Sequence, residues 1–215
     1  MARKPPRRTR ERIVEISLRL FNEFGEPNVT TTVIAEELNI SPGNLYYHYR
    51  NKDAITNTIF GAFEREVDVL LAAPAQRAAT AEDLWLFLHL LFETIWRYRF
   101  LYRDLNDLLS RNRLLEVHFK QILARKVAAA EALCRGLSEA GELRATPGEI
   151  SALATNMSVV ITYWLSFEYV RNPRDQQEGP IAARGAYQVM ALLAPFLVGE
   201  SRRLVETLSQ EYLPA

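Results

Sequence analysis

Cysteine is almost absent from this sequence, and that absence excludes one class of protein. Only Cys134 carries a thiol among the 215 residues. The chain therefore cannot build an internal disulfide framework, and a reducing cytoplasm is the compartment that suits it. Cys134 lies in a helical stretch, and we interpret it as a small buried hydrophobic residue, with a redox sensor as the less favoured alternative.

Long apolar runs are missing as well. The two longest, residues 84–96 and 157–167, are too short to span a bilayer. No apolar segment follows the basic N-terminus, as one would in a signal peptide. We therefore expect a cytoplasmic protein without membrane contact.

The sequence also lacks the usual signatures of catalysis and metal binding. Its three histidines are scattered, and neither an H-x-x-x-H pattern nor paired cysteines offer a metal site. No nucleophile elbow, Walker loop or dinucleotide fingerprint occurs. These absences argue against an enzyme, and we expect no metal and no other cofactor.

A net charge is lacking too, which at first argues against a nucleic-acid partner, but the charges are unevenly distributed. Residues 1–12 hold six basic side chains and one acidic side chain, whereas the remainder holds 20 basic and 25 acidic ones. A basic head on an acidic body favours a polyanion bound at one end of the molecule. A solvated, disordered tail is the alternative explanation.

Apolar residues recur at helical spacing, and the alternation typical of strands is missing, so we predict an all-α fold. The first helix begins near Thr9 and ends at Gly25, which suits the left-handed residue that follows a helix. A second helix has Thr30 or Thr31 as its N-cap. It ends at Asn39, because asparagine also tolerates the left-handed conformation.

The following residues predict a third, short helix after a tight turn. Ser41 is a preferred N-cap and Pro42 is tolerated at the first helical position, so this helix runs from Pro42 to about Tyr49. Asn51 caps a fourth helix that reaches about Leu71. Two helices joined by a four-residue turn form a helix-turn-helix.

Beyond a linker at residues 72–80, the sequence predicts long helices. We place them at residues 81–97, 99–110, 112–140, 147–170 and 180–210. Pro195 should kink the last of them. The chain then has about nine helices in two domains, an N-terminal domain at residues 1–71 and a helical domain at residues 72–215.

The third helix has an unusual exposed face. At about 100° per residue, Leu45 and Tyr49 share the side that points to the core. The other sides present polar and aromatic groups, which are Gly43, Asn44, Tyr46, Tyr47 and His48. Hydroxyls and an imidazole suit phosphates, and amide and ring edges suit bases in a major groove. The alternative is that these rings are half-buried in an ordinary bundle.

The order of residues from about 8 to 60 is specific. It comprises Phe21 to Gly25, Thr31–Thr32, Ile34–Ala35, Ser41, Gly43, Leu45–Tyr46, His48–Tyr49 and Lys52–Asp53. This order resembles the DNA-binding domain of the TetR family of bacterial transcriptional regulators. Asn39 stands where glycine is commoner, and Tyr49 replaces the usual phenylalanine. The Tyr49 hydroxyl therefore needs a partner, for which a backbone carbonyl is one candidate.

The helical geometry and the resemblance together imply a surface for double-stranded DNA. Thr31 and Ser41 stand at helix N-termini, and Lys52 stands in the first turn of the fourth helix, where phosphate oxygens are attracted. The predicted DNA contacts are Arg7, Arg8, Thr31, Ser41, Gly43, Asn44, Tyr46, Tyr47, His48 and Lys52.

For the second domain, the resemblance implies a homodimer formed through the last two helices and, in many members, a small-molecule cavity. The apolar stretches 157–170 and 186–198 are the expected dimer surface, with Val189, Leu193 and Phe196 in it. A mostly apolar cavity is expected to be lined by Trp85, His89, Phe92, Trp96, Phe119, Asn156, Tyr163 and Trp164.

Alternatives remain open for parts of this set. His89 and Glu93 are interpreted first as a structural pair or a solvent-facing stripe. Asn156, Tyr163 and Trp164 can instead lie in the dimer interface, where aromatic residues are enriched. The stretch FLYRDLNDLLSRN at residues 100–112 resembles a subgroup of the family but implies no ligand.

The resulting functional expectation is a dimeric repressor that a small, mostly apolar ligand releases from a near-palindromic operator. One alternative is a DNA-binding regulator without a ligand, and another is a helical enzyme or scaffold whose first helices are structural. The sequence does not distinguish repression from activation.

Overall fold

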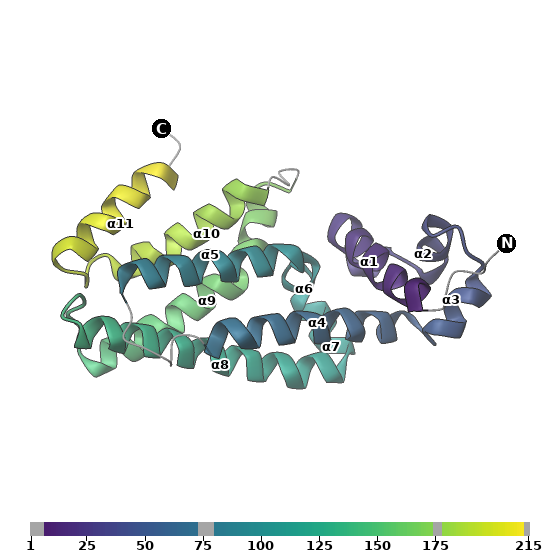
Figure 1. Ribbon diagram of the computed structural model, residues 1–215, viewed down its shortest axis with the longest axis horizontal. Helices are drawn as coiled ribbons and strands as arrows, with labels where there is room; N and C mark the ends of the chain where they lie inside the picture. The colour runs from purple at the N-terminus through teal and green to yellow at the C-terminus, as the bar shows by residue number, and fades with distance from the viewer. Residues whose placement is uncertain (1–6, 73–79, 174–177, 213–215) are drawn as a thin grey trace. The chain divides into compact units, whose positions relative to one another are not determined.

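The computed structural model describes residues 7–72, 80–173 and 178–212, and within these ranges α-helices dominate (Figure 1). Eleven α-helices and a short 3₁₀ helix are present, and the described residues hold no β-strand beyond an isolated bridge between Leu143 and Leu197. The prediction of an all-α fold is confirmed. Residues 1–6, which carry part of the predicted basic head, lie outside the described ranges.

The helices of the first half of the chain are α1 Arg7–Phe24, η1 Glu26–Asn28, α2 Thr31–Glu37, α3 Pro42–His48, α4 Lys52–Ala72, α5 Ala81–Arg97, α6 Arg99–Arg103 and α7 Leu105–Arg111. Those of the second half are α8 Arg113–Glu139, α9 Pro147–Arg171, α10 Glu178–Leu193 and α11 Gly199–Tyr212. The expected number of about nine was too low, because two predicted helices are each divided in two.

The chain forms two compact units. Unit 1 comprises Met1–Arg65 and Tyr98–His118, and unit 2 comprises Glu66–Arg97 and Phe119–Ala215. Unit 1 thus takes in α6, α7 and the start of α8, which the division at residue 71 had assigned to the second domain. Two helices, α4 and α8, begin in unit 1 and continue without interruption into unit 2.

Local capping chemistry fixes the ends of the first helices as expected. Gly25 follows α1 with a φ of 88°, and its N–H donates to the carbonyl of Phe21 at 3.0 Å. Asn39 has a φ of 53° after α2, the left-handed conformation predicted for it. Thr30 and Ser41 accept hydrogen bonds from Val33 N and Asn44 N as the N-caps of α2 and α3.

Unit 1 is held together by one apolar core beneath the helix-turn-helix. Ile34 and Leu45 are fully buried, and α2 packs against both α1 and α3. Aromatic rings join this core to α6, since the ring centroids of Phe21 and Phe100 lie 5.3 Å apart. Phe63 of α4 also lies edge-on to Tyr102, with 5.7 Å between centroids.

Unit 2 is centred on α10, which packs against α5, α9 and α11 (Figure 1). Gly185 allows the closest approach, because a Cβ built there would lie only 2.5 Å from Phe92 Cε1 and 2.7 Å from Trp164 Cδ1. Trp164 also donates its indole N–H to the carbonyl of Ile181 at 2.9 Å.

Two of the predicted helices end earlier than expected. The segment at residues 99–110 is interrupted at Asp104, whose backbone has φ −99° and ψ 17°. Pro195 does not kink a continuous helix but follows its end, since α10 stops at Leu193 and α11 starts at Gly199. Proline has no N–H to donate and crowds the preceding turn, so ending the helix is the less costly solution here.

The helix α9 is the one described helix long and apolar enough to cross a membrane by length and composition. Half of the apolar window in α9 is buried inside the protein, as in a core helix.

Candidate nucleic-acid interface

The outer face of α3 exposes the side chains that the sequence analysis assigned to it. Tyr47 is 83% exposed and Tyr46 is 50% exposed, whereas Leu45 of the same helix is fully buried. Gly43 and Asn44 are also exposed, and His48 is half-buried. The expected division of this helix into a core side and an open side is therefore present in the structure. The alternative of half-buried rings in an ordinary bundle does not fit Tyr47.

Two contacts hold the rings of this face in place. The hydroxyl of Tyr46 lies 3.0 Å from Oγ1 of Thr31, so a hydrogen bond links α3 to the first residue of α2. The rings of Tyr47 and His48 pack edge-on with 5.2 Å between centroids. The exposed groups are thus oriented by their neighbours, which reduces the rotamer freedom that binding would have to remove.

Arg10 adds a basic group that the sequence analysis did not single out. Its Nε donates to the hydroxyl of Tyr49 at 3.3 Å, and its guanidinium lies 5.2 Å from the centre of the same ring. Among the described residues, the Tyr49 hydroxyl therefore accepts from this arginine, where the sequence had suggested a backbone carbonyl as one candidate. The contact fixes one exposed cation of α1 beside the end of α3 (residues 42–48).

The prediction that Lys52 contacts phosphate is not supported by its position. Its Nζ donates to the carbonyl of Glu26 at 2.8 Å and lies 3.4 Å from Glu26 Oε1. A lysine engaged in this way is turned inward, because a buried carboxylate competes for it. Arg7 begins α1, but the side chains of Arg7 and Arg8 lie outside the described residues.

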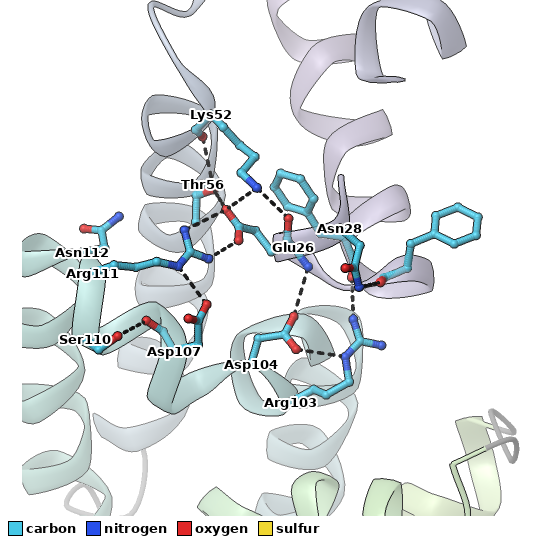
Figure 2. Close-up of polar contacts among 12 residues, drawn as sticks. Glu26, Asn28, Lys52, Thr56, Arg103, Asp104, Asp107, Ser110, Arg111 and Asn112 are labelled. Carbon is cyan, nitrogen blue, oxygen red and sulfur yellow. Dashed lines mark hydrogen bonds and ion pairs between the residues drawn. The ribbon is translucent and has the colours of Figure 1, made fainter. Parts of the chain in front are cut away.

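The carboxylate of Glu26 is the centre of a buried polar cluster in unit 1, which Figure 2 shows. We call the carboxylate and its three side-chain partners, Lys52, Thr56 and Arg111, the Glu26 centre. Arg111 forms a two-pronged ion pair with it, while Thr56 Oγ1 approaches Glu26 Oε1 to 3.5 Å. Burial alone would lower the pKa of Arg111, but its hydrogen bonds to Glu26 and Asp107 raise that pKa above its ordinary value.

A second group of contacts joins α6 to the end of α1. Arg103 donates to the carbonyls of Phe21 at 2.8 Å and Asn22 at 3.3 Å, in the last turn of α1. Asn22 Oδ1 in turn accepts from Phe100 N at 3.1 Å, and Asp104 Oδ2 accepts from Glu26 N at 3.0 Å. The stretch at residues 100–112, singled out earlier without a role, supplies most of these groups.

Comparison with known proteins identifies the family. The family model described as bacterial regulatory proteins of the TetR family matches residues 13–59, and the one described as TetR, bacterial transcriptional repressor, matches residues 62–205. A TetR-family transcriptional regulator from Marinobacter aquaeolei VT8 is 39% identical, with 96% of this chain and 99% of that chain covered and a TM-score of 0.86. The chain belongs to the TetR family.

Two further matches are weaker or cover less of the chain. A bacterial regulatory protein in the TetR family from Rhodococcus RHA1 has a TM-score of 0.64 at 20% identity, with 88% of this chain and 97% of that chain covered, which shows the fold alone. An HTH-type transcriptional regulator of Staphylococcus aureus strain USA300 is 35% identical over 69 residues, or 32% of this chain and 36% of that protein. The chain therefore matches about a third of that relative. This TetR-family protein is a DNA-binding transcriptional regulator and not an enzyme.

The residues predicted to line a ligand cavity in this TetR-family chain do not all lie together. Phe92, Trp96, Phe119 and Trp164 are buried in unit 2, and Trp85 and His89 are half-buried. Asn156 and Tyr163 instead lie on an exposed side of α9 and cannot line its interior. His89 Nδ1 bonds to the carbonyl of Trp85 at 3.0 Å, while Glu93 is exposed, so the solvent-facing interpretation fits Glu93.

One described cavity occurs elsewhere in unit 2. It has a volume of about 190 Å³ and is lined by Asp68, Leu71, Ala72, Arg125, Ala128, Ala129 and Ala132. Its alanine side chains leave space between α4 and α8, and an Asp68–Arg125 ion pair of 2.8 Å stands at its edge. The volume is below the range of about 300–1,000 Å³ usual for sites that hold drug-sized ligands.

Two of the three predicted dimer residues are in positions that do not suit an interface. Val189 and Leu193 are fully buried among the helices of their own unit, and Phe196 is half-buried in the turn after α10. A side chain with no exposed surface cannot meet a partner. An apolar stripe is exposed instead on α9 and consists of Val159, Tyr163, Phe167 and Val170.

Proposed function

We propose that this TetR-family regulator is a cytoplasmic, homodimeric repressor that binds a near-palindromic DNA operator through α3. The observation that carries the proposal is the open face of α3. There an amide and two phenol rings face outward from a helix whose ends and orientation are fixed by caps. Such a short helix with exposed polar groups matches the recognition helix of a helix-turn-helix protein.

The side chains of this face divide by their exposure. Asn44 and Tyr47 project furthest from the core and are assigned to base edges, where an amide can pair with adenine. Tyr46 and His48 lie at the sides of α3 and are assigned to phosphates. Arg10, held by Tyr49, adds a cation for the same backbone. Arg7 and Arg8 extend this set toward the N-terminus on sequence grounds.

The dimer is assigned to α9. Its exposed side chains at residues 159, 163, 167 and 170 are spaced by three or four positions and therefore form one stripe. Two such stripes related by a two-fold axis would cover each other, since an isologous interface uses the same patch twice. The dimer then fixes the distance between two recognition helices and the spacing of the operator half-sites.

The test is selection of duplexes from a random-sequence pool by the purified protein, followed by sequencing. We expect a near-palindrome. Replacing Asn44 and Tyr47 with alanine should relax the preference at particular bases, since a good base contact contributes about 1–3 kcal/mol of discrimination. Replacing Tyr46 or His48 with alanine should lower affinity for all duplexes alike.

A matched control is Glu36→Ala, an exposed change on α2 outside the residues assigned to DNA, for which we expect the selected sequence to be unchanged. Selection of no common sequence by the native protein, or an unaltered preference in the Asn44→Ala/Tyr47→Ala variant, would reject this assignment.

We further propose that a small, mostly apolar molecule releases the repressor, held in unit 2 by the buried rings of Phe92, Trp96, Phe119 and Trp164. A ligand acts only if it prefers one spacing of the recognition helices over the other. A regulator without a ligand is the second candidate. The close packing of Phe92 and Trp164 around Gly185 favours that candidate, because these rings already fill the space between α5, α9 and α10.

Melting of the protein with a library of hydrophobic compounds separates the two candidates. Under the first, compounds that raise the melting temperature also lower operator affinity, with a coupling of about 1–3 kcal/mol. Compounds that stabilise the protein without changing operator affinity would favour the second.

A further inference from the structure

The Glu26 centre is an unusual feature of a DNA-binding domain, because its carboxylate is completely buried. Glu26 lies in η1, between the end of α1 and the start of α2. Removing a carboxylate from water is costly unless cations and hydrogen bonds compensate it, so its partners must stay in place whenever the domain is folded. The position of this loop is therefore tied to the positions of Lys52 and Arg111.

These partners come from helices outside the helix-turn-helix. Lys52 and Thr56 belong to the first turns of α4, and Thr56 also donates to the carbonyl of Lys52 at 3.2 Å. Arg111 is the last residue of α7 and is braced from its other side by Asp107 Oδ2, 2.8 Å from its Nε (Figure 2). The guanidinium thus joins an acid of its own helix to the buried carboxylate of η1.

The residue after Arg111 continues this connection into α8. Asn112 Oδ1 accepts from Leu115 N at 3.3 Å and so caps the first turn of α8. Asn112 Nδ2 donates to Asn57 Oδ1 of α4 at 2.8 Å. Arg111 therefore cannot shift relative to Glu26 without disturbing the start of α8, which runs unbroken from Arg113 to Glu139 and carries residues of unit 2.

We propose that Glu26 and Arg111 are positioning residues that couple the orientation of the helix-turn-helix to α8. A change in α8 would move Arg111 and, through Glu26, the loop that precedes α2. By the reciprocity of linkage, DNA held by α3 would in turn restrict α8. This inference rests on the proposed function, because it requires that the protein binds duplex DNA through α3.

The test compares hydrogen exchange of the protein with and without saturating duplex selected by the native chain. In the native protein, duplex binding should slow exchange of the amides of residues 119–139, far along α8 from any proposed DNA contact. Arg111→Met alone should lower the melting temperature by roughly 10 °C, because it takes the two-pronged ion pair away from the buried Glu26 carboxylate. Glu26→Gln alone should lower it by less, because Arg111 is partly exposed and keeps its ion pair with Asp107.

The double variant Glu26→Gln/Arg111→Met distinguishes coupling from stability. Removing both charges should recover much of the melting temperature lost in either single variant. The double variant should still bind the duplex through α3, yet lose the slowing of exchange in residues 119–139. If the two residues only stabilise the fold, the double variant should recover both the melting temperature and the slowing of exchange.

Arg113→Ala is the matched control, since it removes an arginine two positions away whose 2.5 Å pair with Glu116 is exposed. This variant should keep the native response. If the stable double variant transmits duplex binding to residues 119–139 as the native chain does, the inference is wrong. If the native chain selects no duplex at all, the proposed function fails instead.

Discussion

Lys126 places an amine in the interior of unit 2, where only 2% of the residue is exposed. Its Nζ donates to Thr162 Oγ1 at 3.2 Å and lies 5.6 Å from the centre of the Phe119 ring. Burial lowers the pKa of Lys126 to about 7, because the charged form is poorly solvated there. The cost of this burial should be visible in how stability depends on pH.

The folded pKa of about 7 lies below the ordinary value of 10.5, so between these values the unfolded chain binds a proton that the folded chain does not. The free energy of unfolding should therefore rise with pH in this window, by up to about 1.4 kcal/mol per unit. We expect Lys126→Met to abolish this contribution in urea unfolding at pH 7, 8 and 9. Parallel pH profiles of the two proteins would contradict the assignment.

Residues whose role depends on near neighbours were predictable, and residues with distant partners were not. Ser41 as an N-cap and Asn39 as a left-handed residue follow from rules that span a few positions. Lys52 was assigned to phosphate because its contact with Glu26, 26 positions away, could not be foreseen from the sequence. The Tyr49 hydroxyl meets Arg10, 39 positions away. No local sequence pattern predicts such contacts.

At the scale of single elements, α10 depends on one glycine. Gly185 lets the helix approach Phe92 and Trp164, which a Cβ would meet at 2.5 Å and 2.7 Å. Although alanine favours a helix by about 1 kcal/mol, overpacking of a core costs about 1–3 kcal/mol, and neither ring is at the end of a flexible chain. We expect Gly185→Ala to lower the free energy of unfolding in urea.

Gly148→Ala provides the comparison for this prediction, since Gly148 is also helical but has open space where the Cβ would be. That change should leave stability equal or slightly higher. Equal stability of the two variants would mean that α10 can move away from the rings of α5 and α9 at little cost.

The helices themselves were largely predictable from apolar periodicity, but not where two of them break. Periodicity continues across Asp104, and the interruption there accompanies a tertiary contact, the hydrogen bond from Glu26 N to the Asp104 carboxylate at 3.0 Å. A break that depends on a partner 78 positions away leaves no signal in the neighbouring sequence. Gly and Pro marked the other ends because their backbone restrictions are local.

At the scale of the whole molecule, the apolar stretches 157–170 and 186–198 were predicted together to form a dimer surface, but their large apolar side chains differ in exposure. Leu193 is buried by helices of its own chain, whereas Phe167 is 56% exposed. An apolar sequence indicates that a side chain avoids water. It does not indicate whether that side chain is buried by its own chain or by a second copy. That distinction required the arrangement of α5, α9 and α10.

Phe167→Asp should therefore convert the proposed dimer to a monomer, because two carboxylates would face each other across an isologous apolar stripe. Sedimentation at micromolar concentration should then give the single-chain mass of 24.6 kDa, where the native protein gives twice that value. Operator affinity should fall, since one recognition helix holds only one half-site, while binding to an isolated half-site persists. Leu86→Asp, on the exposed side of α5 at 49% exposure, should remain a dimer with native operator affinity. A dimeric Phe167→Asp protein would locate the interface on another face, and the half-site spacing would then have to be derived from that face.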